Sequence, residues 1–157
     1  MCGISGGIGN IHAYKEEIFA MSKSLNHRGP DDSGFYSSEN VVLNHNRLSI
    51  IDLTKKGSQP MRSFDGRFII IFNGEIYNYI EILKNLGISI NKKGDTRALV
   101  EIFSKKKINC LENLRGMFSF VVFDKKLKKI YLVRDRYGIK PLYYYHRKGI
   151  FLYSSEV

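Results

Sequence analysis

The chain has 157 residues, a length typical of a single domain, and we expect one domain over residues 1–157. Hydrophobic residues make up 43% of the chain and charged residues 25%, a balance that excludes a disordered protein. Two cysteines are too few for a disulfide framework, no apolar run approaches the ~18 residues of a membrane-spanning helix, and the N-terminus lacks the features of a secretory signal. We therefore expect a cytoplasmic protein with no membrane partner.

The net charge is the unusual feature of the composition. Lys and Arg number 25 against 15 Asp and Glu, which gives a formal charge of +10. A basic domain can bind nucleic acid, anionic lipid or an acidic partner. The lysines gather at 105–107, 125–126 and 128–129, where loops or turns are expected, so we favour a solvated surface and expect no nucleic-acid partner. A basic non-catalytic binding domain, for example for RNA, is the alternative.

The first half of the chain predicts strands around one helix. Four apolar or alternating runs predict strands, at 3–9, 34–37, 41–51 and 67–72. The last of these is continuously apolar, which is typical of a strand buried on both faces. Apolar side chains spaced by three or four residues from Tyr14 to Leu25 predict a helix that ends before Arg28-Gly29-Pro30. We expect a polar loop at 54–63.

The second half predicts two helices followed by hairpins. Asn78 with Glu81 resembles a capping box for a helix over 79–86, and Gly87 is its expected stop. Asp95 or Thr96 is expected to cap another helix. Four further strands are expected at 117–123, 130–134, 142–146 and 150–153. Consecutive hairpins with about three helices predict an α+β fold with antiparallel sheets, not a doubly wound parallel fold.

The N-terminus suggests a nucleophile. Cys2 follows the initiator Met1 and precedes Gly3. Removal of Met1 would leave a chain that begins with a cysteine, whose free α-amine and thiol stand on one residue. An α-amine with a pKa of about 7.7–8.0 is a usable base at neutral pH and can activate the nucleophile of its own residue. Position alone favours the alternative, a cysteine that stands there by chance.

Seven segments outweigh that alternative: MCGISG at 1–6, HRGPDDSG at 27–34, RLSIIDL at 47–53, FNGEIYN at 72–78, GDT at 94–96, RGMFSF at 115–120 and RDRYGIKPLYY at 134–144. In this order they strongly resemble the class II glutamine amidotransferases, an N-terminal-nucleophile family, in the form found in asparagine synthetases. The resemblance covers the whole chain. It implies a four-layer α-β-β-α sandwich and hydrolysis of glutamine to glutamate and ammonia.

The resemblance also implies the catalytic residues. Cys2 would attack the side-chain amide carbon of glutamine. The side-chain amide of Asn73 and the backbone N–H of Gly74 would contact the substrate and stabilise the oxyanion. We expect these two residues just past the buried strand, and an Asn-Gly turn is their structural alternative.

The substrate-binding residues follow from the same resemblance. Arg47 would hold the α-carboxylate, to which its planar fork is suited, with support from backbone groups near Ile50 and Ile51. Asp95, helped by Glu75, would pair with the α-ammonium. The structural alternatives are a solvated strand arginine for Arg47 and a helix cap for Asp95.

Other motif residues are interpreted as structural. We expect a shaping role near the site for residues 28–31, a buried ion network for Arg134, Asp135 and Arg136, packing for residues 143–145, and a buried thiol for Cys110. The four histidines lack metal-ligand spacing with the cysteines, so we expect no metal.

Two departures from the family affect the expected partners. Arg97 stands where the family has Glu, and we expect it to point away from the ligand. The family continues, after a segment like SSE at 154–156, into an ATP-using synthetase domain that this sequence lacks. We therefore expect no cofactor in this domain, and ATP and Mg only in a synthetase domain. The expected partners are glutamine, such a synthetase domain in the same or another chain, and a second copy in a homodimer. Aspartate is the favoured acceptor, and another carboxylate such as a sugar acid is the alternative.

Overall fold

The computed structural model describes residues 1–50, 54–89 and 94–157. Within these ranges the first sheet contains, in spatial order, β2 (Asp32–Ser38), β3 (Val41–Arg47), β1 (Gly3–Gly9), β9 (Ile150–Ser154) and β8 (Tyr143–Arg147). The second contains β4 (Met61–Arg62), β5 (Phe68–Ile76), β6 (Gly116–Asp124) and β7 (Lys129–Arg134). The α-helices are α1 (Lys15–Ser24), α2 (Tyr79–Asn85) and α3 (Gly94–Lys106), and short 3-10 helices are η1 (Ile11–Tyr14), η2 (Asn26–Arg28), η3 (Lys55–Gly57) and η4 (Lys107–Asn113).

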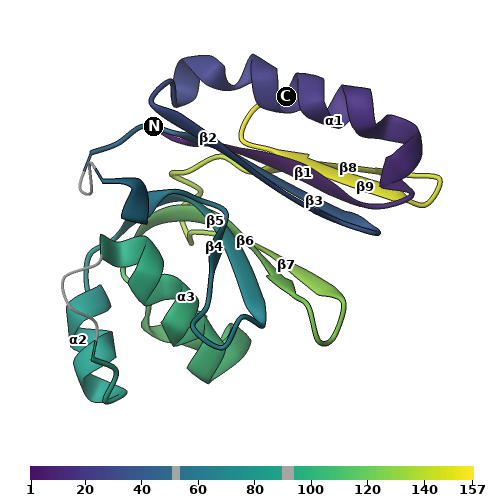
Figure 1. Cartoon of the computed structure of the whole chain (residues 1–157). Helices are drawn as coiled ribbons and strands as arrows, with labels where there is room; N and C mark the ends of the chain where they lie inside the picture. Colours follow the sequence, from purple (N-terminus) through teal and green to yellow (C-terminus); the bar gives the residue numbers. More distant parts are fainter. Residues whose placement is uncertain (51–53, 90–93) are drawn as a thin grey trace.

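The two sheets pack face to face between layers of helix (Figure 1). Every strand pairing within them is antiparallel. α1 covers the outer face of the first sheet, where Ile18 packs with Val42, and α2 and α3 cover the outer face of the second. The predicted α+β class and the four-layer α-β-β-α order are therefore confirmed. None of the helices in the described ranges has the length and hydropathy needed to cross a membrane.

β5 shows why a continuously apolar strand forms at this place. Its side chains alternate between the two faces of the sheet. Phe68, Ile70 and Phe72 belong to the core under α3, whereas Ile69 and Ile71 belong to the core between the sheets. All five are at most 3% exposed, so the prediction of burial on both faces is confirmed.

The layer between the sheets changes from apolar to polar along the strands. Its centre contains Ile4, Leu43, Ile71 and Val121. Two residues further along β3 and β5, the same inward faces carry polar side chains, and β6 does the same two residues before Val121. These residues are His45, Asn73 and Ser119, each at most 1% exposed. The polar end of this layer leads to the candidate site.

Two strand predictions had the wrong ends. The strand expected at 41–51 ends at Arg47, because its partner β1 pairs only from Gly3, opposite Asn46. Conversely, β5 continues to Ile76, because β6 keeps pairing with it, and Asn73 lies opposite Ser119. Asn73 and Gly74 therefore lie inside a strand, and the Asn-Gly turn is excluded. The loop expected at 54–63 contains η3 and the short strand β4.

The helix ends agree with the sequence only in part. The stop at Gly87 is confirmed: its φ is +62°, and the N–H of Ile88 donates to the carbonyl of Leu83 at 2.9 Å. The prediction of a capping box at Asn78 is wrong, since the Asn78 side chain makes no cap hydrogen bond. Asn78 binds the segment before β6 instead, donating to the carbonyl of Asn113 and accepting the N–H of Arg115, each at 2.9 Å.

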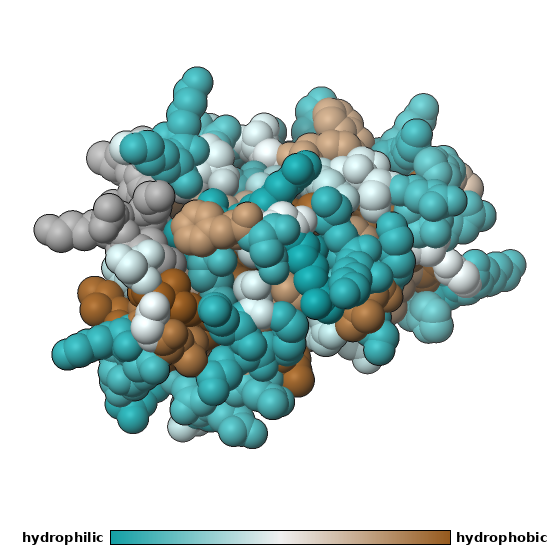
Figure 2. All heavy atoms as spheres, turned by 60° about the horizontal axis from the view of Figure 1, so that its bottom comes forward, coloured by the Kyte–Doolittle hydropathy of each residue, from teal (hydrophilic) through white to brown (hydrophobic). Residues whose placement is uncertain are grey.

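The outer surface is mainly hydrophilic on the side of α2 and α3 (Figure 2). The lysines at 105–106 and 125–129 are exposed, as a solvated surface requires. The packing predicted for residues 143–145 is found for Tyr144, whose ring stacks on that of Phe151 with the centroids 5.5 Å apart, but none of the three side chains is buried. They lie on β8, at the edge of the first sheet, and are 47%, 73% and 51% exposed.

Candidate active site

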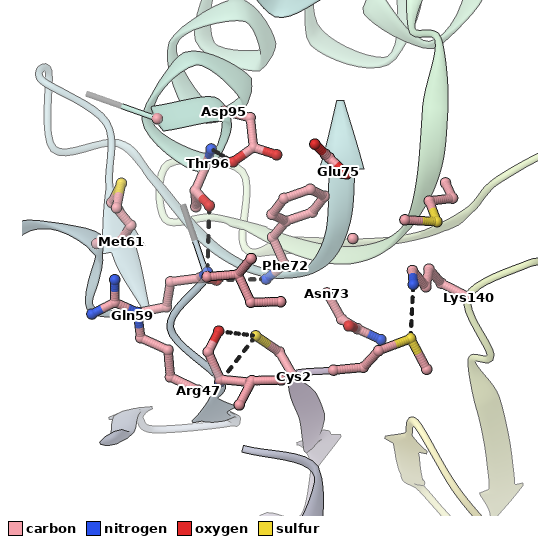
Figure 3. A pocket seen from close by; sticks show the side chains of 17 residues that line it. Cys2, Arg47, Gln59, Met61, Phe72, Asn73, Glu75, Asp95, Thr96 and Lys140 are labelled. Carbon is pink, nitrogen blue, oxygen red and sulfur yellow. Dashed lines mark hydrogen bonds between the residues drawn. The ribbon is translucent and has the colours of Figure 1, made fainter. Parts of the chain in front are cut away.

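A cavity of about 220 Å³ opens where the N-terminus, the ends of β3 and β5, and the start of α3 meet. Its lining includes every expected site residue that the structure describes: Cys2, Arg47, Ile50, Asn73, Gly74, Glu75 and Asp95. Ile51 lies outside the described residues. Figure 3 shows Cys2 and Asn73 on one side of the cavity and Asp95 and Glu75 on the opposite side. The structure thus brings together groups that are up to 93 positions apart in the chain, from Cys2 to Asp95.

Cys2 is held just before β1 by two neighbouring segments. Its Sγ accepts the N–H of Leu48 at 3.4 Å and lies 3.7 Å from the carbonyl oxygen of the same residue. The Nε of Arg28 donates to the Cys2 carbonyl at 3.1 Å. Leu48 therefore holds the Cys2 thiol, and it directly follows Arg47 in the chain. The end of β3 thus positions both the thiol and the Arg47 guanidinium.

Opposing influences act on the thiol. Burial raises the pKa of Cys2 and is the strongest influence, while the N–H of Leu48, the amino terminus and the guanidinium groups of Arg47 and Arg28 lower it. The pKa is raised overall, so the thiol is protonated at neutral pH. A base that takes its proton during the reaction is needed.

Asn73 presents an unused donor to this cavity. Its side chain is 1% exposed, and Nδ2 has no hydrogen-bond partner among the described residues. A buried amide N–H without a partner is costly, and such groups are often functional. Because Asn73 lies in a central strand of its sheet, its direction is fixed before any substrate arrives.

Gly74 is required by its backbone. Its φ is +153°, and a Cβ built there would stand 2.2 Å from the carbonyl oxygen of Met117 on β6. Any other residue would force β5 and β6 apart. This tight pairing holds the Gly74 backbone beside the cavity, next to the Asn73 amide.

Arg47 is a buried strand arginine and not a solvated one. It is 7% exposed, and its Nη1 donates to the carbonyl of Thr54 at 2.9 Å. This bond anchors the guanidinium at the wall of the cavity. Ile50, by contrast, is 72% exposed at the rim.

Asp95 ties α3 to the end of β5. One carboxylate oxygen accepts the N–H of Ile76 at 3.1 Å, and the other accepts the N–H of Thr96 at 2.8 Å. Asp95 lies in the first turn of α3, and its bond to the Thr96 N–H satisfies one of the N–H groups at the start of this helix. Burial raises its pKa, these N–H groups oppose the rise, and the half-buried Glu75 adds to it. A ligand ammonium would favour the charged form of Asp95.

Three polar residues at the cavity were not predicted as site residues from the sequence: Gln59 and Lys140, which are buried, and Thr96, which is partly buried. Gln59 accepts the N–H of Phe72 at 2.6 Å through Oε1, and its Nε2 lies 3.5 Å from Oγ1 of Thr96, so it connects β5 with α3. Lys140 reaches the cavity from the loop after β7. Thr96 and Lys140 do stand inside the motifs GDT and RDRYGIKPLYY, which was the available signal. Gln59 had none.

The loop at 28–31 has the shaping role predicted for it beside the site. Arg28 donates to Cys2 and forms an ion pair with Glu156 at 2.7 Å. Asp31 accepts the N–H of Ser49 at 2.7 Å. Arg97 also lies off the cavity lining, where it pairs with Glu101 and donates to the carbonyl of Arg62.

The ion network predicted at residues 134–136 is wrong. Asp135 forms no ion pair with a described residue. Its carboxylate accepts four backbone N–H groups, at 3.0–3.1 Å, from Phe118, Tyr137, Ile139 and Lys140. Burial works to raise the pKa of Asp135, but these bonds hold it below the usual value. Asp135 therefore folds the loop after β7 around one charge.

The described residues offer neither a metal site nor a second reactive thiol. No three of their His, Cys, Asp and Glu side chains are grouped to hold a metal ion. Cys110 is 2% exposed, and burial raises its pKa to about 12, so its thiol is inert.

Comparison with known proteins places this geometry in a family. The sequence model for the glutamine amidotransferase domain matches residues 1–157. The chain is 42% identical to asparagine synthetase [glutamine-hydrolyzing] 1 of Bacillus subtilis, over 99% of this chain and 26% of that protein. It is 38% identical to putative asparagine synthetase [glutamine-hydrolyzing] 2 of Methanocaldococcus jannaschii, over 100% of this chain and 34% of that protein.

A solved structure supports the fold. Glutamine phosphoribosylpyrophosphate amidotransferase from B. subtilis, complexed with ADP and GMP, superposes with a TM-score of 0.81 at 18% identity. The match covers 98% of this chain and 42% of that one. The chain spans about a quarter to a third of the length of the two synthetase relatives. The family model and these relatives together show that the chain belongs to the glutamine amidotransferase domain family, class II, of the asparagine synthetase type.

Proposed function

We propose that residues 1–157 form one glutaminase domain that hydrolyses glutamine to glutamate and ammonia through a thioester on Cys2. The observation that carries this proposal is the unpartnered Nδ2 of Asn73 in the cavity that Cys2 also lines. An oxyanion needs preorganised donors, and the Asn73 amide with the Gly74 N–H would supply two.

The groups of the cavity match the ends of glutamine. Arg47 would bind the α-carboxylate. Asp95 and Glu75, which lie across the cavity from Cys2, would bind the α-ammonium (Figure 3). Fixing the zwitterion in this way places the side-chain amide toward the thiol. Glutamine would therefore be preferred over simple amides.

The reaction requires removal of Met1. While Met1 is present, the Cys2 nitrogen is part of a peptide bond and is not a base. In the mature chain the α-amine takes the thiol proton, and Sγ forms a bond with the amide carbon. The tetrahedral intermediate collapses, the C–N bond breaks, and the amine gives its proton to the leaving nitrogen, which departs as ammonia. Water then hydrolyses the thioester, which releases glutamate and restores the thiol.

We further propose that a synthetase domain, in the same or another chain, uses the ammonia to amidate aspartate with ATP and Mg. The names of the relatives and their greater length support this partner. Another carboxylate acceptor, such as a sugar acid, is the alternative, because the acceptor would bind to the synthetase domain and not to the glutamine cavity. A cytoplasmic location and a homodimer also stay predictions.

The test is release of glutamate and ammonia from glutamine by the processed domain. We expect equal amounts of the two products, and none above background for Cys2→Ala. Cys110→Ala is the matched control, since it removes the other thiol, outside the cavity. Equal ammonia release by wild type and Cys2→Ala would rule out the glutaminase.

A further inference from the structure

Lys140 is a buried cation at the candidate active site. Its side chain lines the cavity and is 5% exposed. Its Nζ lies 2.7 Å from Sδ of Met1, and a thioether is only a weak acceptor (Figure 3). No ion pair joins Lys140 to a carboxylate in the parts of the chain that the structure describes. Burying an unpaired ammonium is costly, so its presence here calls for a functional reason.

The preceding loop fixes Lys140 in this place. Its N–H donates to Asp135 at 3.0 Å, and its carbonyl accepts from Nε of Arg134 at 3.0 Å. Arg134 also donates to the carbonyl of Gly138 at 2.6 Å. The motif RDRYGIK thus folds around Asp135 and Arg134 and holds the Lys140 backbone at the cavity. The proposed function gives no role to a lysine at this place.

The position of Met1 shows how close Lys140 lies to the reacting amine. Five covalent bonds separate Sδ of Met1 from the Cys2 nitrogen and span at most about 6.5 Å, so Nζ of Lys140 lies within about 9 Å of that nitrogen. After removal of Met1, the nitrogen becomes an α-amine and the ammonium loses its contact with Sδ. Two positive charges would then lie within about 9 Å of each other at one cavity, which disfavours protonation of the weaker base.

We propose that Lys140 is a positioning residue that acts through Cys2: its ammonium keeps the mature α-amine unprotonated at neutral pH, ready to take the thiol proton. This rests on the proposed function. A charge at about 9 Å in an effective dielectric of about 20 shifts such a titration by about one pH unit.

Among the described residues, other charges near Cys2 lie on η2, β3, β5, α3 and the segment after β9. Arg28, at the end of η2, is paired with Glu156, and Arg47, at the end of β3, donates to the carbonyl of Thr54. Glu75 on β5 and Asp95 on α3 carry the opposite sign. All five remain in the variants below, so a change in the titration reports on Lys140.

The experiment is a direct titration of the amine in the processed domain. The chain has two cysteines, so nitrogen-15 cysteine labels only Cys2 and Cys110, and the α-amine shift can be followed with pH without any turnover. Lys140→Met and Lys140→Gln remove the charge, Lys140→Arg keeps it, and Lys125→Met removes an exposed charge from the hairpin between β6 and β7.

We expect the amine pKa to rise by about one unit in Lys140→Met and Lys140→Gln, and to stay unchanged in Lys140→Arg and Lys125→Met. The acid limb of kcat at saturating glutamine should move by the same amount. An amine that titrates at the same pH in wild type and in whichever neutral variant folds would overturn the inference. A shifted amine in a domain without glutaminase activity would instead refute the proposed function and leave the role of Lys140 standing.

Discussion

The imidazole of His45 on β3 joins the carbonyl oxygen of Phe72 on β5, with Nε2 at 3.2 Å. Because a carbonyl only accepts, Nε2 carries the hydrogen in the neutral ring. Nδ1 has no hydrogen-bond partner among the described residues. This bond connects the two sheets one residue before Asn73 and two residues before Arg47. It holds the strand that carries the donor against the strand that carries the cation.

Acid should weaken the fold through His45. Burial lowers its pKa to about 4, so the unfolded chain, with a pKa of about 6.5, binds more protons between these values. The free energy of unfolding should therefore fall by up to about 3 kcal/mol as the pH drops from about 6.5 to about 4. His45→Gln keeps a donor but cannot titrate, so urea unfolding across this range should show a smaller slope with pH. The exposed His12→Gln is the control, and an unchanged slope in His45→Gln would contradict the assignment.

Asn73→Ala should act on turnover more than on binding. Loss of one oxyanion donor should reduce kcat by ~100-fold or more, while KM for glutamine changes little, because the donor is needed most in the transition state. Steady-state kinetics of the processed domain measure both. Ser119→Ala is the matched control, since Ser119 faces Asn73 across the β5–β6 pair and its Oγ likewise has no partner in the described residues. A reduced kcat in both variants would indicate distortion of the strands and not loss of the donor.

Arg47→Lys should act on glutamine binding more than on turnover, the opposite of Asn73→Ala. A point charge replaces a planar fork, so the α-carboxylate loses a charge-assisted bond and KM should rise roughly tenfold or more. The kcat at saturating glutamine should change less, since the thiol and the oxyanion donors stay in place. Arg147→Lys on the exposed edge strand β8 should leave both constants unchanged. A large fall in kcat with normal KM would exclude a substrate-binding role for Arg47.

Asp95 should make glutamine binding sensitive to acid. Burial raises its pKa, so the carboxylate protonates at a higher pH than usual and then no longer attracts the α-ammonium. The KM for glutamine should therefore rise as the pH falls through this raised pKa. In Asp95→Asn the KM should be high and lack this dependence, and the exposed Glu39→Gln should behave as wild type. A wild-type KM that stays flat with falling pH would contradict the pairing.

Sequence reasoning succeeds where a feature is local in the chain. The alternation that buries both faces of β5, the stop at Gly87 and the hairpins from β6 to β9 are encoded by neighbouring residues. It fails where a partner far away in the chain decides. The end of β3 depends on where β1 starts, and the use of Asn78 depends on the segment before β6. In the site, the motifs led to Cys2, Arg47, Asn73, Gly74, Glu75 and Asp95, but not to Thr96 and Lys140, although both stand inside motifs. Gln59 was missed because only folding brings it to Phe72.

The central claim is that Cys2 becomes a nucleophile through its own α-amine. The most direct measurement compares glutamate release by two forms of the same protein, one with Met1 removed and one with Met1 retained, alongside glutamine binding by each. We predict that the processed form hydrolyses glutamine and that the Met1-retained form releases no glutamate above background. The retained form should still bind glutamine, and any loss of affinity should come only from Met1 occupying part of the cavity. Full turnover by the Met1-retained form would contradict the account, because its Cys2 nitrogen is an amide and cannot accept the proton.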